Sequence, residues 1–317
     1  MTNKNKKRRA APSYRQTPSQ PEAAGSQPRR GLLDGIFGGS RAAPMASMPR
    51  VRTAVSRGVV TVLSTPVLVV GVPALLWLMW LSVVLGGYQG PFAIFVNAFA
   101  LPPVGTSFDA SLATGIFGLQ GGLIGIVVFV VMRAIIMTFL AAWIVDVLER
   151  GHVTSGAAIR ALRAFPTSLA VNMASIALLT LASLIGPMLG ASFAILIQVA
   201  SLVAGVYLFA AAPVIAVTER RRMPDAMSRS IRAARMPGTG SLVFATLYVI
   251  PALALVVAPG KPGSLIGVNP SVGAWALAIV ASLLHVAMLA AFAFRYLSIA
   301  DEVPDAPPPR ARTRAAR

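Results

Sequence analysis

The chain has 317 residues, of which 56% are hydrophobic and only 12% are charged, and its mean hydropathy is +0.73. An average soluble domain carries roughly 25% charged residues, so this composition excludes an ordinary soluble protein and indicates a membrane protein. The net charge is +18, and the chain contains no cysteine, which excludes disulfides, thiolate catalysis and cysteine-ligated metals.

The first 57 residues form a basic tail, with twelve Lys or Arg residues against two acids. Residues 1–30 are rich in Lys, Arg, Pro, Ser and Gln and cannot bury enough apolar surface to offset chain entropy, so we expect disorder. Anionic lipid attracts such a tail by about 1 kcal/mol for each basic residue near the surface. Nucleic acid is a less favoured partner, because basic tails on membrane proteins more often determine topology.

A short apolar segment, GLLDGIFG, interrupts this tail at residues 31–38. If the segment turned helical, one face would carry Leu32, Leu33, Ile36 and Phe37. One interpretation is a docking motif for a protein partner, and the other is an apolar fragment of linker.

Six hydrophobic runs follow, each near or above the roughly 20 residues that cross a bilayer as a helix. They cover residues 59–86, 114–147, 167–186, 191–217, 239–258 and 272–298. Pro66 and Pro73 predict a kink or a break in the first run. The second run is too long for one crossing, and we expect a single helix whose last turns project into the cytoplasm.

The first connection, residues 87–111, contains the apolar stretch PFAIFVNAFAL at residues 91–101. About 11 residues are too few for a helical span, so this stretch is expected to be either re-entrant or interfacial.

Positive charge is distributed unevenly among the connections. Nearly all of the 28 Lys and Arg residues lie in the two tails and in the second and fourth connections, whereas Lys261 lies in the fifth and Arg133 inside a run. The positive-inside rule then places both termini in the cytoplasm. We predict a multi-pass protein of a bacterial plasma (inner) membrane, with a disordered tail over 1–57, a six-helix transmembrane domain over 58–298 and a second disordered tail over 299–317.

The second and fourth connections resemble each other. Each leaves a span with Glu-Arg and continues into a short basic segment, which carries Arg160 and Arg163 in one copy and Arg229 and Arg232 in the other. This pattern predicts cytoplasmic elbow helices that lie in the interface, with these four arginines directed toward anionic headgroups. Residues 49–58 are a weaker third copy. The alternative is that any cytoplasmic connection gathers arginine.

Four polar residues in or near the runs are candidates for an intramembrane polar site. A charge inside a span costs at least about 2.5 kcal/mol unless it snorkels or pairs, so Arg133 either contacts an anion within the bundle or anchors topology. His285 could titrate or contact a ligand, although a lone histidine more often bonds a neighbouring helix. Asn172 and Gln198 can hydrogen-bond across helix interfaces.

The catalytic inventory of the sequence is small. It shows no nucleophile elbow, phosphate-binding loop, dinucleotide fingerprint or metal-ligand cluster. We therefore expect no enzymatic activity, no cofactor and no metal.

The stretch from about 205 to 240 resembles the bacterial family of six-span domains related to the glycerophosphodiester phosphodiesterase membrane domain. The resemblance is carried by Ala212-Pro213-Val214, Glu219, Ala226 and Arg229-Ser230, although an aromatic residue usually follows where this chain has Ile231. It implies a helical bundle with cytoplasmic elbows and no settled activity, and it does not imply the hydrolase activity, because the chain has no room for the catalytic domain.

Two hypotheses for function follow. The first is a non-enzymatic membrane protein that acts as a scaffold or binds lipids and partners through its basic elbows and tail. The alternative is a transporter or lipid-handling protein in which Arg133 and His285 line an intramembrane cavity.

Overall fold

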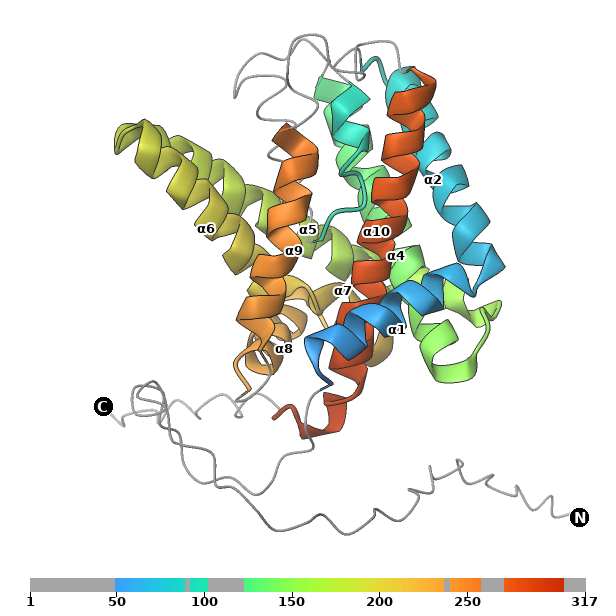
Figure 1. Cartoon of the computed structure of the whole chain (residues 1–317). Coiled ribbons are helices and arrows are strands. Elements are labelled where there is room, and N and C mark those ends of the chain that lie inside the picture. The colour runs from blue at the N-terminus through green and yellow to red at the C-terminus, as the bar shows by residue number, and fades with distance from the viewer. Residues whose placement is uncertain (1–48, 89–91, 102–122, 237–239, 258–270, 305–317) are drawn as a thin grey trace, which may run out of the picture. The chain divides into compact units, whose positions relative to one another are not determined.

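The structure is a computed structural model that describes residues 49–88, 92–101, 123–236, 240–257 and 271–304 (Figure 1). These residues belong to one compact unit, residues 45–317. Within the described ranges every element is helical, which confirms the all-α prediction. In chain order the elements are α1 (Val51–Leu63), α2 (Pro66–Leu85), the short 3-10 helix η2 (Phe92–Phe95), α4 (Leu123–Arg150), α5 (Gly156–Met188), α6 (Ala191–Phe209), α7 (Ala212–Glu219), α8 (Met223–Ala234), α9 (Ser241–Val257), α10 (Val272–Leu297) and the 3-10 helix η4 (Ala300–Glu302).

Five helical segments of the described residues are long and apolar enough to cross a membrane. They are Pro66–Leu85, Val127–Arg150, Gly156–Leu179, Ile195–Glu219 and Val272–Leu297. The remaining predicted run, residues 239–258, corresponds to α9, whose clearly apolar part, Ser241–Ala252, is shorter. These helices are compatible with a multi-pass membrane protein.

The first predicted run, residues 59–86, is divided between two helices. A residue before proline is driven out of the helical region, and Thr65 is accordingly extended, with φ −108° and ψ 100°. Pro66 then opens α2 at the position where its missing N–H costs nothing. The predicted break therefore occurs at Pro66, whereas Pro73 lies inside α2.

Helix α1 runs across α10 rather than beside it (Figure 1). A Cβ atom on Gly58 would lie 2.2 Å from the carbonyl oxygen of Ala287 and 2.9 Å from the backbone nitrogen of Ala291. Only glycine allows the two backbones to approach so closely. Since α1 begins at Val51, it includes residues 51–57, which the sequence placed in the disordered tail.

The two expected elbows differ from each other. The first is not a separate helix, because α5 continues without interruption from Gly156 through Pro166 to Met188. The second is a separate helix, α8, with Asp225 in its first turn. Thr167 on α5 donates to the carbonyl of Arg221 just before α8, with 3.0 Å between oxygen atoms.

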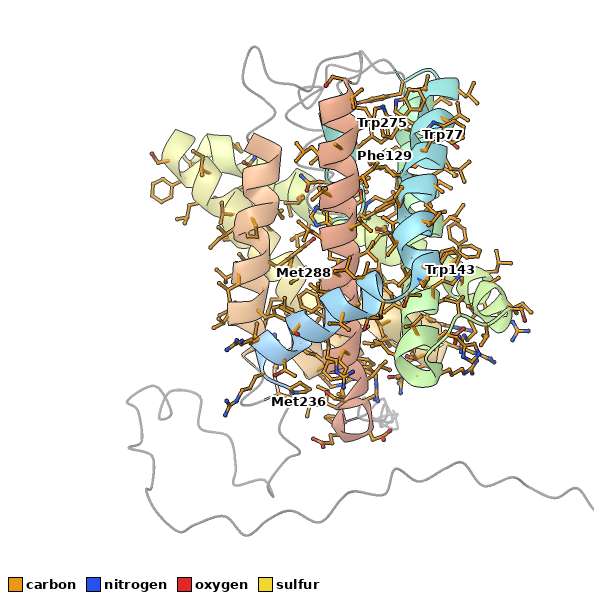
Figure 2. All side chains as sticks on the ribbon, turned by 45° about the vertical axis from the view of Figure 1, so that its right-hand side comes forward. Trp77, Phe129, Trp143, Met236, Trp275 and Met288 are labelled. Carbon is orange, nitrogen blue, oxygen red and sulfur yellow. The ribbon has the colours of Figure 1, made fainter. Side chains whose placement is uncertain are left out.

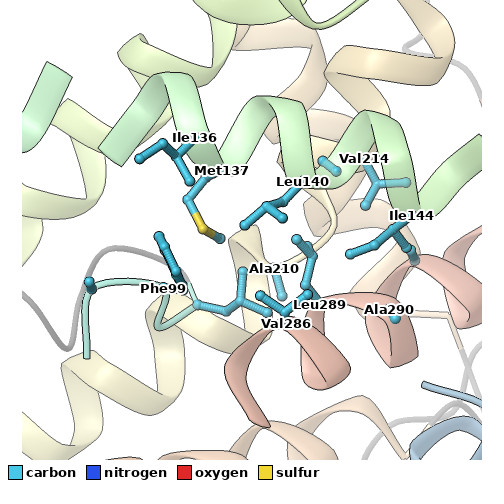
Figure 3. Close-up of a cluster of buried hydrophobic side chains, with 14 of the residues drawn as sticks. Phe99, Ile136, Met137, Leu140, Ile144, Ala210, Val214, Val286, Leu289 and Ala290 are labelled. Carbon is cyan, nitrogen blue, oxygen red and sulfur yellow. The ribbon is translucent and has the colours of Figure 1, made fainter. Parts of the chain in front are cut away.

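The core forms where α4 faces α10. Figure 3 shows side chains of α4 directed toward α10, with side chains from the α6–α7 connection, from α7 and from the segment before α4 beside them. The labelled residues of this cluster are Phe99, Ile136, Met137, Leu140, Ile144, Ala210, Val214, Val286, Leu289 and Ala290.

Many nitrogen-bearing side chains gather at one end of the helices, beside α1 and around the α4–α5 connection (Figure 2). We call this the basic end, and it also includes the α7–α8 connection and the end of α10 (Figure 1). Large apolar side chains such as Trp77, which is 53% exposed, cover the outer face of α2 (Figure 2).

Candidate functional site

The segment Phe92–Leu101, which we call the entering segment, lies buried among the helices. Its residues with described side chains are each at most 3% exposed, although only its first turn is helical. Two of its own backbone bonds are short-range, from Ala98 N–H to the Phe95 carbonyl and from Ala100 N–H to the Asn97 carbonyl. Non-helical backbone placed away from water needs further partners from the surrounding protein, and side chains of α4 and α9 supply them.

Arg133, on α4, binds this backbone directly. Its Nε donates to the carbonyl of Ala98 at 2.8 Å, and one terminal nitrogen donates to the carbonyl of Ala100. The other terminal nitrogen donates to Oδ1 of Asn172 on α5, at 2.7 Å. Arg133 is 2% exposed, and each of its three guanidinium nitrogens donates to a backbone or amide oxygen. Its role is therefore structural: it holds the entering segment in place.

His285, near the middle of α10, holds the same segment from another side. Its Nε2 lies 2.7 Å from Oδ1 of Asn97, and its Nδ1 lies 2.8 Å from the hydroxyl of Tyr248 on α9. That hydroxyl also accepts the backbone N–H of Leu101 at 2.7 Å. An amide oxygen can only accept, so Nε2 carries the proton, and Nδ1 accepts from Tyr248. The neutral ring thus has both nitrogens engaged.

Three of the four predicted intramembrane residues, Arg133, Asn172 and His285, belong to this network. The fourth, Gln198, lies on α6 with a half-buried side chain. Asn97 and Tyr248 were missed, although Asn97 carried a signal as the lone polar residue in an apolar stretch. The arrangement fastens an irregular segment inside a helical bundle, which is a structural use of buried polar groups.

A second cluster lies where α4 meets α5, at the basic end. The buried carboxylate of Asp146 accepts from the backbone N–H of Thr154 at 3.0 Å and from its hydroxyl at 2.6 Å. Arg160 on α5 donates to the other carboxylate oxygen, and Arg150 lies 3.4 Å from the same oxygen. An unpaired buried carboxylate is costly, so Asp146 on α4 keeps Thr154 of the connection and Arg160 near the start of α5 close to it. The contacts therefore hold α5 at its angle to α4.

A third cluster lies between α7, α8 and the end of α10. Nε of Arg229 lies 2.8 Å from the Glu219 carboxylate and 2.9 Å from the hydroxyl of Tyr296. Its terminal nitrogens donate to the carbonyls of Val303 and Ala300, at 3.0 and 2.8 Å. Burial opposes the charge of Arg229, but the hydrogen bond with Tyr296 and the attraction of Glu219 raise its pKa above the ordinary value.

The four arginines predicted to contact headgroups therefore have different surroundings. Arg160 and Arg229 direct their guanidinium groups inward to acids of the same chain, which is not the orientation that the elbow prediction requires. Arg163 is exposed, and Arg232 is half-buried, with one nitrogen 2.6 Å from the hydroxyl of Ser228. Residues 299–303, assigned to the C-terminal tail, are held by Arg229.

The exposed arginines of α1 share a surface with apolar side chains. Ala54 and Gly58 face α10, whereas a shallow surface groove is lined by Arg52, Thr53, Ser56, Arg57 and Val60. The start of α5 repeats the combination, because exposed Arg163 lies beside Ile159 and Leu162, which are 55% and 64% exposed. Such helices are typical of a membrane interface.

Other predicted features cannot be assigned to this site. Leu32, Leu33, Ile36 and Phe37 lie outside the described residues. Among the residues that the structure describes, no group of three or more His, Asp or Glu side chains is arranged to hold a metal ion. No family model, curated protein or solved structure matches this chain.

Proposed function

We propose that the chain is a six-span integral membrane protein of the plasma membrane, with both termini in the cytoplasm, that binds anionic lipid at its basic end and carries out no catalysis. The observation that carries this proposal is the two-sided character of α1. One face packs on α10 through Gly58, and the other presents Arg52 and Arg57 with the apolar Val60 and Leu63, which are 55% and 64% exposed.

The orientation of α1 supports the lipid assignment. A helix that crosses α10 lies roughly in the plane of a membrane that α10 spans (Figure 1). Its apolar residues can then insert beneath the headgroups while its arginines contact lipid phosphates. We assign α1, the start of α5 and α8 as the three interfacial elbows, and α9 as the one span in addition to the five long apolar helices.

The ion pairs at the basic end support a binding role rather than acid–base chemistry. Asp146 and Glu219 are each held by arginines of the same chain, so neither carboxylate is poised to exchange a proton with a substrate. We also propose that the chain is related to the six-span membrane domains associated with phosphodiesterases. That relationship would agree with a non-catalytic role, because it implies the helical bundle and the elbows but no activity.

Transport through a cavity at Arg133 and His285 has less support. In the described residues both side chains bind the entering segment, and the contacts given above occupy them in a structural role. We therefore retain lipid binding as the proposed function, with partner binding through the N-terminal tail as its extension.

Lipid binding can be tested with the full chain in nanodiscs that contain phosphatidylglycerol and phosphatidylcholine. Native mass spectrometry should show phosphatidylglycerol retained preferentially, and the double variant Arg52→Gln/Arg57→Gln should lose most of that preference. A control double variant, Arg310→Gln/Arg312→Gln, removes the same charge from the C-terminal tail and should keep it. Equal retention of both lipids by the unchanged protein would contradict the proposal.

A further inference from the structure

A pocket lies at the basic end between α6, α8, α9 and α10, apart from the α1 surface. Its lining includes Arg295, together with the hydroxyl-bearing residues Tyr207, Ser230, Ser241 and Tyr296. The rest of the lining is apolar: Ala210, Ala211, Ala233, Ala234 and Phe292. A ligand with a small polar group attached to an apolar body would match this combination of lining residues.

The position of Arg295 gives the pocket its charge. The residue stands in the last turn of α10, is 2% exposed, and holds its guanidinium carbon 4.9 Å from the centre of the Phe244 ring. Stacking on an aromatic ring fixes the plane of a guanidinium group without supplying a negative charge. In the sequence, Arg295 is hard to distinguish from the other basic residues at the cytoplasmic ends of spans.

Among the residues that the structure describes, no acidic side chain lines the pocket. Glu219 lies behind Tyr296, whose hydroxyl donates to it, but its carboxylate is already contacted by Arg221 and Arg229. Arg232, on the same helix as Ser230, does not line the pocket. The described wall of the pocket is therefore positive, and the Glu219 carboxylate behind it is paired with two arginines.

The first turn of α9 adds to the positive electrostatic potential of the pocket. Ser241 is the first residue of α9 and lines the pocket, so the N-terminal end of this helix lies at the same wall as Arg295. The start of a helix favours a negative group. A planar guanidinium suits the oxygens of a phosphate. The hydroxyls of Ser230 and Tyr296 already donate to the Leu208 carbonyl and to Glu219, so Tyr207 and Ser241 supply the hydroxyl donors.

We infer that this pocket binds a phosphate group, either the headgroup of an anionic lipid or a free phosphate ion. The cavity volume is about 40 Å³, which suits a headgroup rather than a whole lipid. The apolar lining would accompany the first part of a glycerol or acyl chain. This site is separate from the α1 surface of the proposed function, and either can fail without the other.

The test uses the full chain in micelles of an uncharged detergent, titrated with dihexanoyl phosphatidic acid, inorganic phosphate and dihexanoyl phosphatidylcholine, with binding read from thermal unfolding. Binding of inorganic phosphate would identify free phosphate as sufficient, and binding of phosphatidic acid alone would identify the lipid; both support the site. Equal binding of phosphatidylcholine, or no binding by either anion, would overturn it.

Variants separate the pocket from the basic tails. Arg295→Gln should weaken anion binding by about tenfold or more, given the strength of charge-assisted hydrogen bonds. Because Arg295→Gln could disturb folding, Ala211→Leu provides a second variant that fills the pocket and leaves every charge in place. Ala200→Leu, on the exposed face of α6 outside the pocket, is its control. If Ala211→Leu and Ala200→Leu bind phosphatidic acid equally well, the site is not this pocket. Arg310→Gln/Arg312→Gln, which removes the same charge from the C-terminal tail, should leave this binding unchanged.

Discussion

The imidazole of His285 bonds the side chain of Asn97, 188 residues earlier in the chain, with 2.7 Å between Nε2 and Oδ1. This contact joins the middle of α10 to a segment that is neither a span nor an exposed loop. If His285 were replaced by Phe, Asn97 and Tyr248 would each lose a buried partner, so the free energy of unfolding should fall by about 2 kcal/mol. His285→Gln, which can still donate and accept, should lose less. Unfolding by denaturant in micelles measures both, and equal losses would argue against the assigned bonds.

Arg133 should matter through its geometry as well as its charge. Arg133→Lys keeps a cation but cannot reach Ala98, Ala100 and Asn172 together, so it should destabilise the protein by about 1–2 kcal/mol. The expected local effect is faster hydrogen exchange at Ala98 and Ala100, measured by mass spectrometry on the purified chain. Unchanged exchange across residues 92–101 would show that the entering segment does not depend on this side chain.

Gly58 should be intolerant of any side chain. In Gly58→Ala the new methyl group would meet the Ala287 carbonyl at 2.2 Å, which forces α1 away from α10 at a cost of about 1–3 kcal/mol. The control is Gly156→Ala, where the added atom would make an ordinary 3.7 Å contact with Thr154. Melting temperatures in micelles should fall for the first variant and hold for the second. A stable Gly58→Ala variant would contradict the close crossing.

Glu219 and Arg229 should be energetically coupled. Their side chains are 19% and 9% exposed and lie 2.8 Å apart, so a double-mutant cycle with Glu219→Gln and Arg229→Gln should give a coupling energy of about 1–2 kcal/mol. Arg229→Gln should also loosen residues 300–303, because it removes donors to two of their carbonyls. Proteolysis near the C-terminus reports that loosening. Additive effects of the two substitutions would show that the pair is not coupled.

The helical class and the five candidate spans could be predicted from the sequence, because long apolar runs leave few other structures for a chain in lipid. Proline residues in the sequence mark a helix break at one position and not at another. Pro66 marks a real break, since its neighbour Thr65 is free to be extended, whereas α5 continues through Pro166. A local rule can state that a break is favoured but not whether tertiary packing overrides it.

The partners of buried polar residues were beyond the reach of sequence patterns. Arg133 and His285 were singled out because each is polar inside an apolar run, but the groups they bind come from residues 97–101, far along the chain. The partners of the elbow arginines likewise could not be predicted from the sequence pattern. Arg160 and Arg163 are three residues apart, yet one binds Asp146 and the other is exposed, and only the angle between α4 and α5 decides which.

The most direct test of the central claim is to measure on which side of the membrane the start of α10 and the start of α5 lie. The chain has no cysteine, so Val272→Cys and Arg163→Cys each place a single thiol, at the exposed start of α10 and at the basic end. In intact cells a membrane-impermeant maleimide should label Val272→Cys, and it should label Arg163→Cys only after the membrane is permeabilised. Labelling of Arg163→Cys in intact cells would place the basic end outside and contradict both the orientation and the lipid-binding role built on it.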